Sequence, residues 1–160
     1  MKNSLNVKGH FDVTCLDASG NEKWTQAFPN GIVDEGIDYM LESAFNSGTQ
    51  SGTWYIGLID NSPAPTLAAG DTLASHAGWS ENSDYTGNRP AWGEGTASGR
   101  TITNAATADF AITGTVTIYG IFVCDQATGT AGTLWSTAAF SSTASVTSGD
   151  TLKVTYTVSG

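Results

Sequence analysis

Thr151-Leu152-Lys153-Val154-Thr155-Tyr156-Thr157-Val158 is the segment of this sequence in which apolar and polar residues alternate most regularly. Its even-numbered residues are all apolar, and its odd-numbered residues are threonine or lysine. A period of two residues is typical of a β-strand that has one buried face and one face in water. The segment therefore predicts a half-buried strand within a larger sheet.

Strand-like segments of the same kind recur along the chain. They are rich in Thr, Val, Ile and aromatic residues, and Gly, Ser, Asn and Asp separate them with turn-forming stretches. They lie at residues 9–16, 22–28, 54–60, 100–103, 107–112, 115–124 and 132–140. About eight short strands with such turns are typical of a sandwich. We expect an all-β fold, an antiparallel jelly-roll-like β-sandwich, in which residues 9–28 form a hairpin.

One segment departs from this pattern. Between residues 33 and 46 the spacing of apolar residues changes to about 3.6, the period of an α-helix. We expect one short helix there, with an apolar face formed by Val33, Ile37, Met40, Leu41 and Ala44. The acids Asp34, Glu35, Asp38 and Glu42 occupy the other side, where the helix dipole favours those of the first turns. This position accounts for them without a metal site.

The length of 160 residues fits a single domain. Within it we expect an N-terminal hairpin or arm at residues 1–31 and a β-sandwich body at residues 32–160. Cys15 and Cys124 lie in separate apolar strand-like runs, too few for a disulfide framework, and are expected to be buried reduced thiols.

The charge balance excludes several classes of function. Six Lys and Arg stand against 15 Asp and Glu, which gives a net charge of −9. No basic residue lies between Trp24 and Asn88 to neutralise phosphates, so we expect no nucleic-acid partner. No apolar run of about 18 residues is present, so we expect no membrane partner. The start of the chain lacks the apolar stretch of a signal peptide, which predicts synthesis in a cytoplasm.

Few residues could support catalysis. His10 and His76 are the only histidines, and neither lies at metal-ligand spacing from other ligands. A glycosidase would need paired carboxylates, and the candidates Glu81, Asp84 and Glu94 lie in a Gly- and Ser-rich stretch that holds them poorly. We therefore expect no enzyme activity, no catalytic residues, no metal and no cofactor.

The irregular stretch from residue 61 to residue 99 is unusually long for a loop inside a compact domain. It carries Trp79 and Trp92 together with His76 and Arg89. Its aromatic residues either fill a second small core or anchor a protein or glycan interface. Arg89 is the first basic residue for more than sixty positions, and we expect it at a contact.

Six segments together resemble small virion structural proteins of tailed bacteriophages, at residues 17–24, 30–41, 54–59, 69–79, 89–92 and 148–154. Their order and spacing cover nearly the whole chain. The resemblance is to capsid cement (decoration) proteins, which implies a jelly-roll-like protein that binds the exterior of the capsid and stabilises contacts between major capsid protein subunits. Some relatives are tail or head fibre proteins, so a fibre or receptor-binding module that contacts host surface glycan is the alternative. The family carries no catalytic residues.

The expected partners are the major capsid protein and further copies of this chain, as a dimer or trimer, because Thr-rich strands with few charges would otherwise expose adhesive edges. Residues 1–31 hold three of the four lysines and are hypothesised to reach a neighbouring chain, so that deleting residues 1–28 would prevent virion incorporation and leave a folded core. The expected partner-binding residues are Lys2, Lys8, Lys23, Trp24, His76, Trp79, Arg89 and Trp92.

Overall fold

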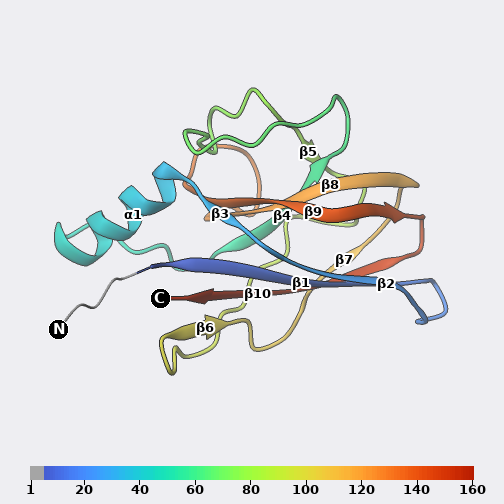
Figure 1. Ribbon diagram of the computed structural model, residues 1–160, viewed down its shortest axis with the longest axis horizontal. Coiled ribbons are helices and arrows are strands. Elements are labelled where there is room, and N and C mark those ends of the chain that lie inside the picture. Colours follow the sequence, from blue (N-terminus) through green and yellow to red (C-terminus); the bar gives the residue numbers. More distant parts are fainter. Residues whose placement is uncertain (1–5) are drawn as a thin grey trace.

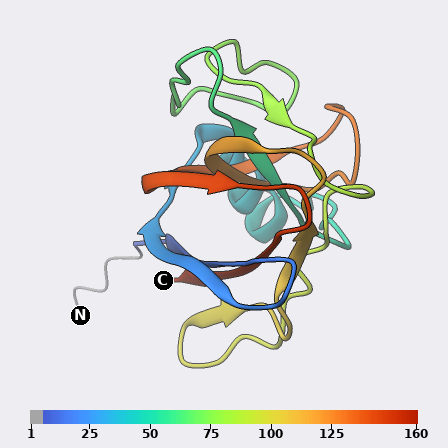
Figure 2. The same ribbon diagram turned by 90° about the vertical axis from the view of Figure 1, so that its right-hand side faces the viewer.

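Two antiparallel sheets packed against each other build the protein, whose computed structural model describes residues 6–160 (Figures 1 and 2). Sheet A has the order β2 (Glu22–Pro29), β1 (Lys8–Leu16), β10 (Thr151–Ser159) and β6 (Thr101–Thr103), and β7 (Ala108–Ala111) also pairs with β10. Sheet B has the order β3 (Gly31–Ile32), β9 (Leu134–Val146), β8 (Val116–Cys124), β4 (Tyr55–Asp60) and β5 (Glu81–Asn82). The predicted all-β sandwich is confirmed, although this strand order does not establish jelly-roll connectivity.

The N-terminal hairpin is built into the sandwich. Strand β1 pairs with β2 on one side and with β10 on the other, in a register that places Phe11 beside both Phe28 and Tyr156. Phe11, Val13 and Cys15 point inward and are fully buried. Residues 8–29 are therefore not a detached arm, and a chain without residues 1–28 would lose an interior strand. Lys2 lies outside the described residues.

Strand β9 extends beyond the segment that its sequence predicts. The expected strand ends at residue 140, whereas β9 continues to Val146. Its hydrogen-bond ladder with β8 is interrupted between Ala139 and Ala144. In this interval the side chain of Gln26 in β2 supplies a hydrogen bond instead, because its Oε1 accepts from the Ser142 amide at 3.0 Å. The small polar residues of this stretch do not alternate with apolar ones, which hides the strand from periodicity.

Two apolar clusters stabilise the fold. The main core lies between the sheets, where Phe11 stacks on Tyr156 with ring centroids 4.4 Å apart. The second lies on the outer face of sheet B, where residues from the stretch after β4 pack over it (Figure 2). Leu73 and Trp79 belong to this second core, together with Phe122 of β8. Of the two roles predicted for the aromatic residues of the irregular stretch, Trp79 has the first, since it fills a second small core.

The helix α1 (Asp34–Phe45) lies at one end of the sandwich (Figure 1), at the predicted position. Gly36 is buried against the backbone of Trp135, where a Cβ atom would collide with the carbonyl oxygen. The Glu35 carboxylate accepts from the amides of Leu73 at 3.0 Å and Leu134 at 2.7 Å. These contacts hold the start of the helix against sheet B and the second core.

The far end of α1 is poorly covered. Leu41 is 46% exposed and Phe45 is 83% exposed, so the sandwich does not cover Leu41 of the predicted apolar face. Met40, one residue earlier, is partly buried and faces the sandwich. Among residues 6–160, no helix has the length and apolar character that crossing a membrane requires.

Candidate functional site

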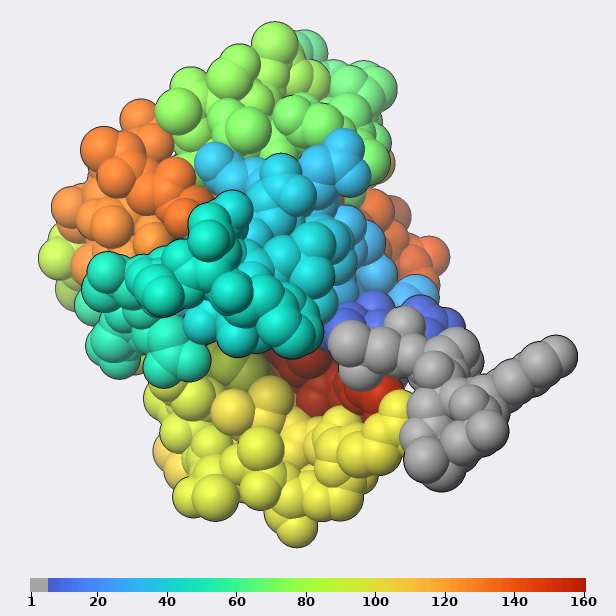
Figure 3. All heavy atoms as spheres, turned by 90° about the vertical axis from the view of Figure 1, so that its left-hand side faces the viewer, coloured from blue at the N-terminus to red at the C-terminus, as the bar shows by residue number. Residues whose placement is uncertain are grey.

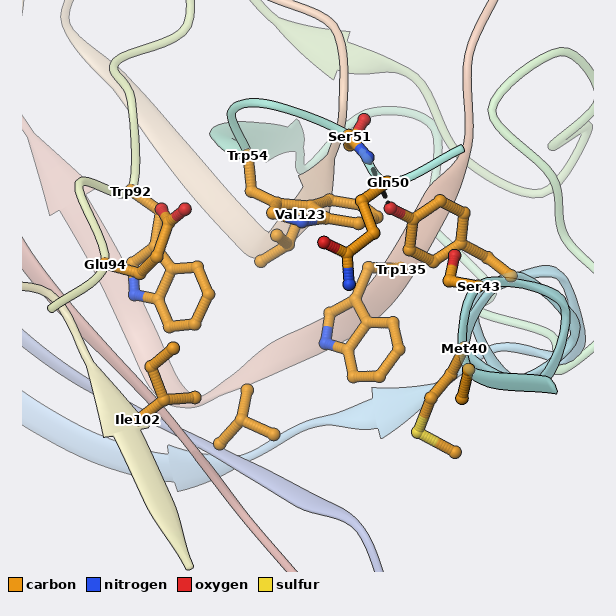
Figure 4. Close-up of a pocket in the computed structure, with 13 residues that line it drawn as sticks. Met40, Ser43, Gln50, Ser51, Trp54, Trp92, Glu94, Ile102, Val123 and Trp135 are labelled. Carbon is orange, nitrogen blue, oxygen red and sulfur yellow. Dashed lines mark hydrogen bonds between the residues drawn. The ribbon is translucent and has the colours of Figure 1, made fainter. Parts of the chain in front are cut away.

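A pocket of about 480 Å³ opens at the end of the sandwich that carries α1. Its volume falls within the range of about 300–1,000 Å³ common for small-molecule sites. Figure 3 shows this end of the molecule, with α1 and the loop after it on one side and the chain around residues 95–105 on the other. The close-up in Figure 4 shows three indole rings, from Trp54, Trp92 and Trp135, in the wall. We call this site the tryptophan pocket.

Each of the three tryptophans is held by a specific contact. Trp92 is mostly buried, and its Nε1 donates to the backbone oxygen of Tyr156 at 2.8 Å. Trp135 is the second residue of β9 and donates its Nε1 to the Tyr156 hydroxyl, also at 2.8 Å. Trp54 precedes β4, and its carbonyl oxygen accepts from the Trp92 amide. The aromatic wall is therefore positioned before any ligand arrives.

Tyr156 of β10 joins this wall to the main core. Its hydroxyl accepts from both Trp135 Nε1 and Asn30 Nδ2, the latter at 2.7 Å. Burial raises the pKa of this phenol to about 12, although the hydrogen bonds from Ser136, Trp135 and Asn30 oppose the rise. The hydroxyl stays neutral throughout the physiological range, so the hydrogen bonds that orient Trp135 do not change with pH.

The helix side of the pocket is fixed by Tyr39. Its ring packs edge-on against Trp54 at a centroid distance of 5.1 Å and an interplanar angle of 87°. Its hydroxyl accepts from the amide of Ser51, and the Ser51 hydroxyl in turn donates to the Asp125 carboxylate at 3.0 Å. The loop that follows α1 is thereby tied both to the helix and to the end of β8.

Four polar side chains line the otherwise apolar pocket: Ser43, Gln50, Ser51 and Glu94. The Ser51 hydroxyl is already bound to Asp125. The Ser43 hydroxyl oxygen is buried and has no hydrogen-bond partner. Within residues 6–160, neither the Gln50 amide nor the half-buried Glu94 carboxylate has a hydrogen-bond or ion-pair partner, and no Lys, Arg or His lines the pocket. The pocket thus combines flat aromatic surfaces with hydrogen-bonding groups that are left for a ligand.

Arg89 is not at a surface contact, contrary to expectation. It is only 5% exposed and forms a two-point ion pair with Glu81, from Nε at 2.7 Å and from a terminal nitrogen at 2.6 Å. Its other terminal nitrogen donates to the carbonyl oxygens of Gln126 and Gly129, each at 2.9 Å. A guanidinium satisfied in this way connects the chain around β5 to the loop after β8, which is a structural role.

Most of the other expected contact residues also have structural roles and lie apart. Trp79 is buried and donates its Nε1 to Asp71, while His76 stacks on its ring at 3.8 Å. Trp24 packs edge-on against Phe140 and donates to the Ser145 carbonyl oxygen, and Lys23 pairs with Asp150. Lys8 is exposed at the start of β1. Among the members of this set that the structure describes, Trp92 alone lines the tryptophan pocket.

The acidic residues considered for glycoside hydrolysis are not paired. Glu81 is bound to Arg89, and Asp84 accepts from the side chain of Asn82 at 3.0 Å. Glu94 lines the tryptophan pocket without either of them. Both cysteines are buried free thiols, as predicted, and burial together with the neighbouring Asp150 raises the pKa of Cys15 to about 11.

Sequence reasoning missed Trp54, Trp135, Tyr39 and Gln50. The available signal was positional, because Trp54 and Trp135 lie next to the starts of β4 and β9. Which strand ends of an antiparallel sheet lie together can be inferred only when the strand pairing is known. The strand order could not be read from the sequence, so these residues could not be brought together.

Comparison with known families identifies the class of protein. The family model described as podophage GP4 fiber I protein gp80 matches residues 37–158, from within α1 almost to the end of β10. The match covers about three quarters of the chain and every residue of the tryptophan pocket. No curated protein matches the chain.

The chain is therefore a bacteriophage virion structural protein. More particularly, it belongs to the family of the podophage GP4 fiber I protein gp80.

Proposed function

We propose that this protein is a fibre subunit of a tailed-phage virion and that the tryptophan pocket binds carbohydrate on the host surface. It performs no catalysis in this role. The observation that carries the proposal is the pocket itself, in which three tryptophans surround hydrogen-bonding groups that the protein does not use. The fibre family supports it, because a fibre projects from the particle toward the host.

The chemistry of the pocket suits a sugar. A pyranose has faces covered with C–H groups, which are attracted to the electron-rich faces of aromatic rings, and an edge of hydroxyls that donate and accept hydrogen bonds. Trp54 and Trp135 supply the ring surfaces, and the Gln50 amide with the Ser43 hydroxyl supplies polar partners. An apolar occupant would leave the buried Ser43 hydroxyl without a hydrogen bond, at an energetic cost.

Capsid cement remains the other proposal for this chain. No feature of the described residues favours it over the fibre role, and the expected binding of a major capsid protein on the capsid exterior stays a prediction. Self-association as a dimer or trimer is likewise a prediction. The exposed Leu41 and Phe45 at the end of α1 are the apolar side chains most available for such a contact.

Binding to host polysaccharide tests the carbohydrate proposal. Purified wild-type protein should bind immobilised polysaccharide from the host cell surface, and Gln50→Ala and Trp54→Ala should weaken binding, each with an unchanged circular dichroism spectrum. Phe45→Ala is the matched control because Phe45 is exposed on the same helix end but does not line the pocket. Equal binding by all four proteins, or no binding by the wild type, would overturn the proposal.

A further inference from the structure

We infer that the tryptophan pocket selects uncharged sugars and amino sugars and rejects acidic ones, with Glu94 as the selecting residue. This inference rests on the proposed carbohydrate function. It assigns the class of ligand from the charge inside the pocket, which the overall fold and the family do not specify.

Glu94 is placed by the same segment that carries Trp92. The amide of Trp92 donates to the Trp54 carbonyl oxygen at 2.8 Å, and three residues later the amide of Gly95 donates to the Thr103 carbonyl oxygen at 2.8 Å. Glu94 itself pairs with Asn104 through a backbone bridge. The segment is therefore held from both sides, and the Glu94 side chain extends from it at the pocket wall (Figure 4).

Among residues 6–160, no basic side chain lines the pocket or forms an ion pair with the Glu94 carboxylate, and Arg100, in the hairpin that Glu94 and Asn104 join, is not part of the lining. The arginine nearest in sequence, Arg89, is occupied by Glu81, and Lys153 pairs with Asp109 on the outer face of sheet A. The charged residues of α1 are all acidic. With a net charge of −9 for the chain, an anionic sugar would meet repulsion on approach and again at Glu94.

An amino sugar, which carries a positive charge, is attracted to Glu94. Its ammonium group can donate to the Glu94 carboxylate in a charge-assisted hydrogen bond, which is stronger than a bond between neutral groups. A neutral sugar can donate hydroxyl hydrogens to the same oxygens. A sugar carboxylate has no hydrogen to donate and adds a second negative charge.

Binding of three size-matched trisaccharides tests the inference by isothermal titration calorimetry at mildly acidic pH. Chitotriose carries protonated amines, tri-N-acetylchitotriose is neutral, and trigalacturonic acid is anionic. We expect wild-type protein to bind the first two and not the third. Glu94→Gln should weaken chitotriose binding by about fivefold, the upper end for a solvent-accessible ion pair, and leave the neutral trisaccharide nearly unchanged.

A matched control separates the pocket charge from the overall charge. Glu22→Gln changes the net charge equally, at the exposed first residue of β2, which follows the β1–β2 turn at the other end of the sandwich (Figure 1). It should bind all three trisaccharides as the wild type does. Added salt should weaken only the chitotriose complex, because screening acts on the charge pair.

The outcomes distinguish the two levels of the proposal. Preferential binding of trigalacturonic acid, or an unchanged chitotriose affinity in Glu94→Gln, would overturn the selectivity and leave carbohydrate binding intact. Failure of every trisaccharide and of host polysaccharide would overturn both. Sedimentation could also show that wild-type protein is oligomeric and Trp54→Ala is monomeric. That result would assign the pocket to a contact between copies of the chain and would overturn both carbohydrate binding and the selectivity.

Discussion

Tyr156 connects the main core to the tryptophan pocket. Its ring lies in the main core against Phe11, while its hydroxyl and its backbone oxygen each hold one indole of the tryptophan pocket. A residue in this position fixes the walls of the tryptophan pocket to the sheet. Preorganisation of this kind lowers the entropic cost of binding.

Tyr156→Phe removes the hydroxyl and leaves the ring. Because Trp135 Nε1 and Asn30 Nδ2 would both lose their acceptor, we expect the free energy of unfolding to fall by about 1–3 kcal/mol in urea denaturation. Sugar affinity should fall as well, since Trp135 loses its anchor. Tyr119→Phe, which removes a hydroxyl outside the pocket, is the control, and equal effects from the two variants would contradict this role.

Asp150 contributes to the response of the fold to acid. Burial alone would raise the pKa of its carboxyl, but hydrogen bonds from Lys23 and the Thr147 amide outweigh burial and hold the pKa below the ordinary value of 3.8. A carboxyl with a lower pKa in the folded state stabilises the fold above 3.8, and this stabilisation is lost as the pH falls through the folded-state pKa.

Asp150→Asn should therefore be less stable than wild type at neutral pH, by about 2 kcal/mol from the weakened hydrogen bonds. The difference should shrink as the pH falls below 3.8, which thermal unfolding at a series of pH values would measure. Asp109→Asn is the control because its pair with Lys153 is exposed on both sides and contributes little. A difference that is constant with pH would contradict the assignment.

At the scale of elements, α1 owes its place to Gly36. The helix lies directly on the backbone of Trp135, and the same stretch of β9 then presents the Trp135 indole to the pocket. The approach leaves no room for a side chain at residue 36. The geometry of the pocket therefore depends on one glycine in the first turns of the helix.

Gly36→Ala should push α1 away from β9. Because overpacking a tight contact costs about 1–3 kcal/mol, we expect a lower melting temperature together with weaker ligand binding. Gly52→Ala is the matched control, since a Cβ atom there meets no other atom within 4 Å. A Gly36→Ala protein with wild-type stability and binding would show that the helix can shift without consequence.

The elements themselves could largely be predicted from the sequence. The hairpin, the helix and β10 each carry a clear period, and the observed bounds agree within one or two residues for these elements. The extension of β9 could not be predicted because residues 140–146 are mostly small and polar. Their place in the strand depends on pairing with β8 and on contacts with Gln26, which are tertiary interactions.

The candidate site was less accessible to sequence reasoning. Trp92 and Glu94 were candidates from the sequence, as an aromatic residue and an acid in an irregular stretch, and both line the pocket. Trp79 and Arg89 were candidates from the same stretch, yet both are buried in structural contacts. Composition identified residues with binding chemistry, but only the fold determines which of them remain available to a ligand.

For the whole molecule, the two ends of the sandwich differ in character. One end carries the β1–β2 turn, and the other carries α1, the tryptophan pocket and the exposed Leu41 and Phe45 (Figure 1). In a fibre whose subunits face the host, the pocket end should point away from the particle. A cement protein would instead bind across capsid subunits with an extended surface.

Cryo-electron microscopy of the purified virion tests this account most directly, because it gives the location and the orientation of the chain together. The account predicts density for this protein in a fibre, with α1 and the tryptophan pocket open to solvent at the host-facing end. Copies spread over the capsid shell, with the α1 end covered by major capsid protein, would contradict it.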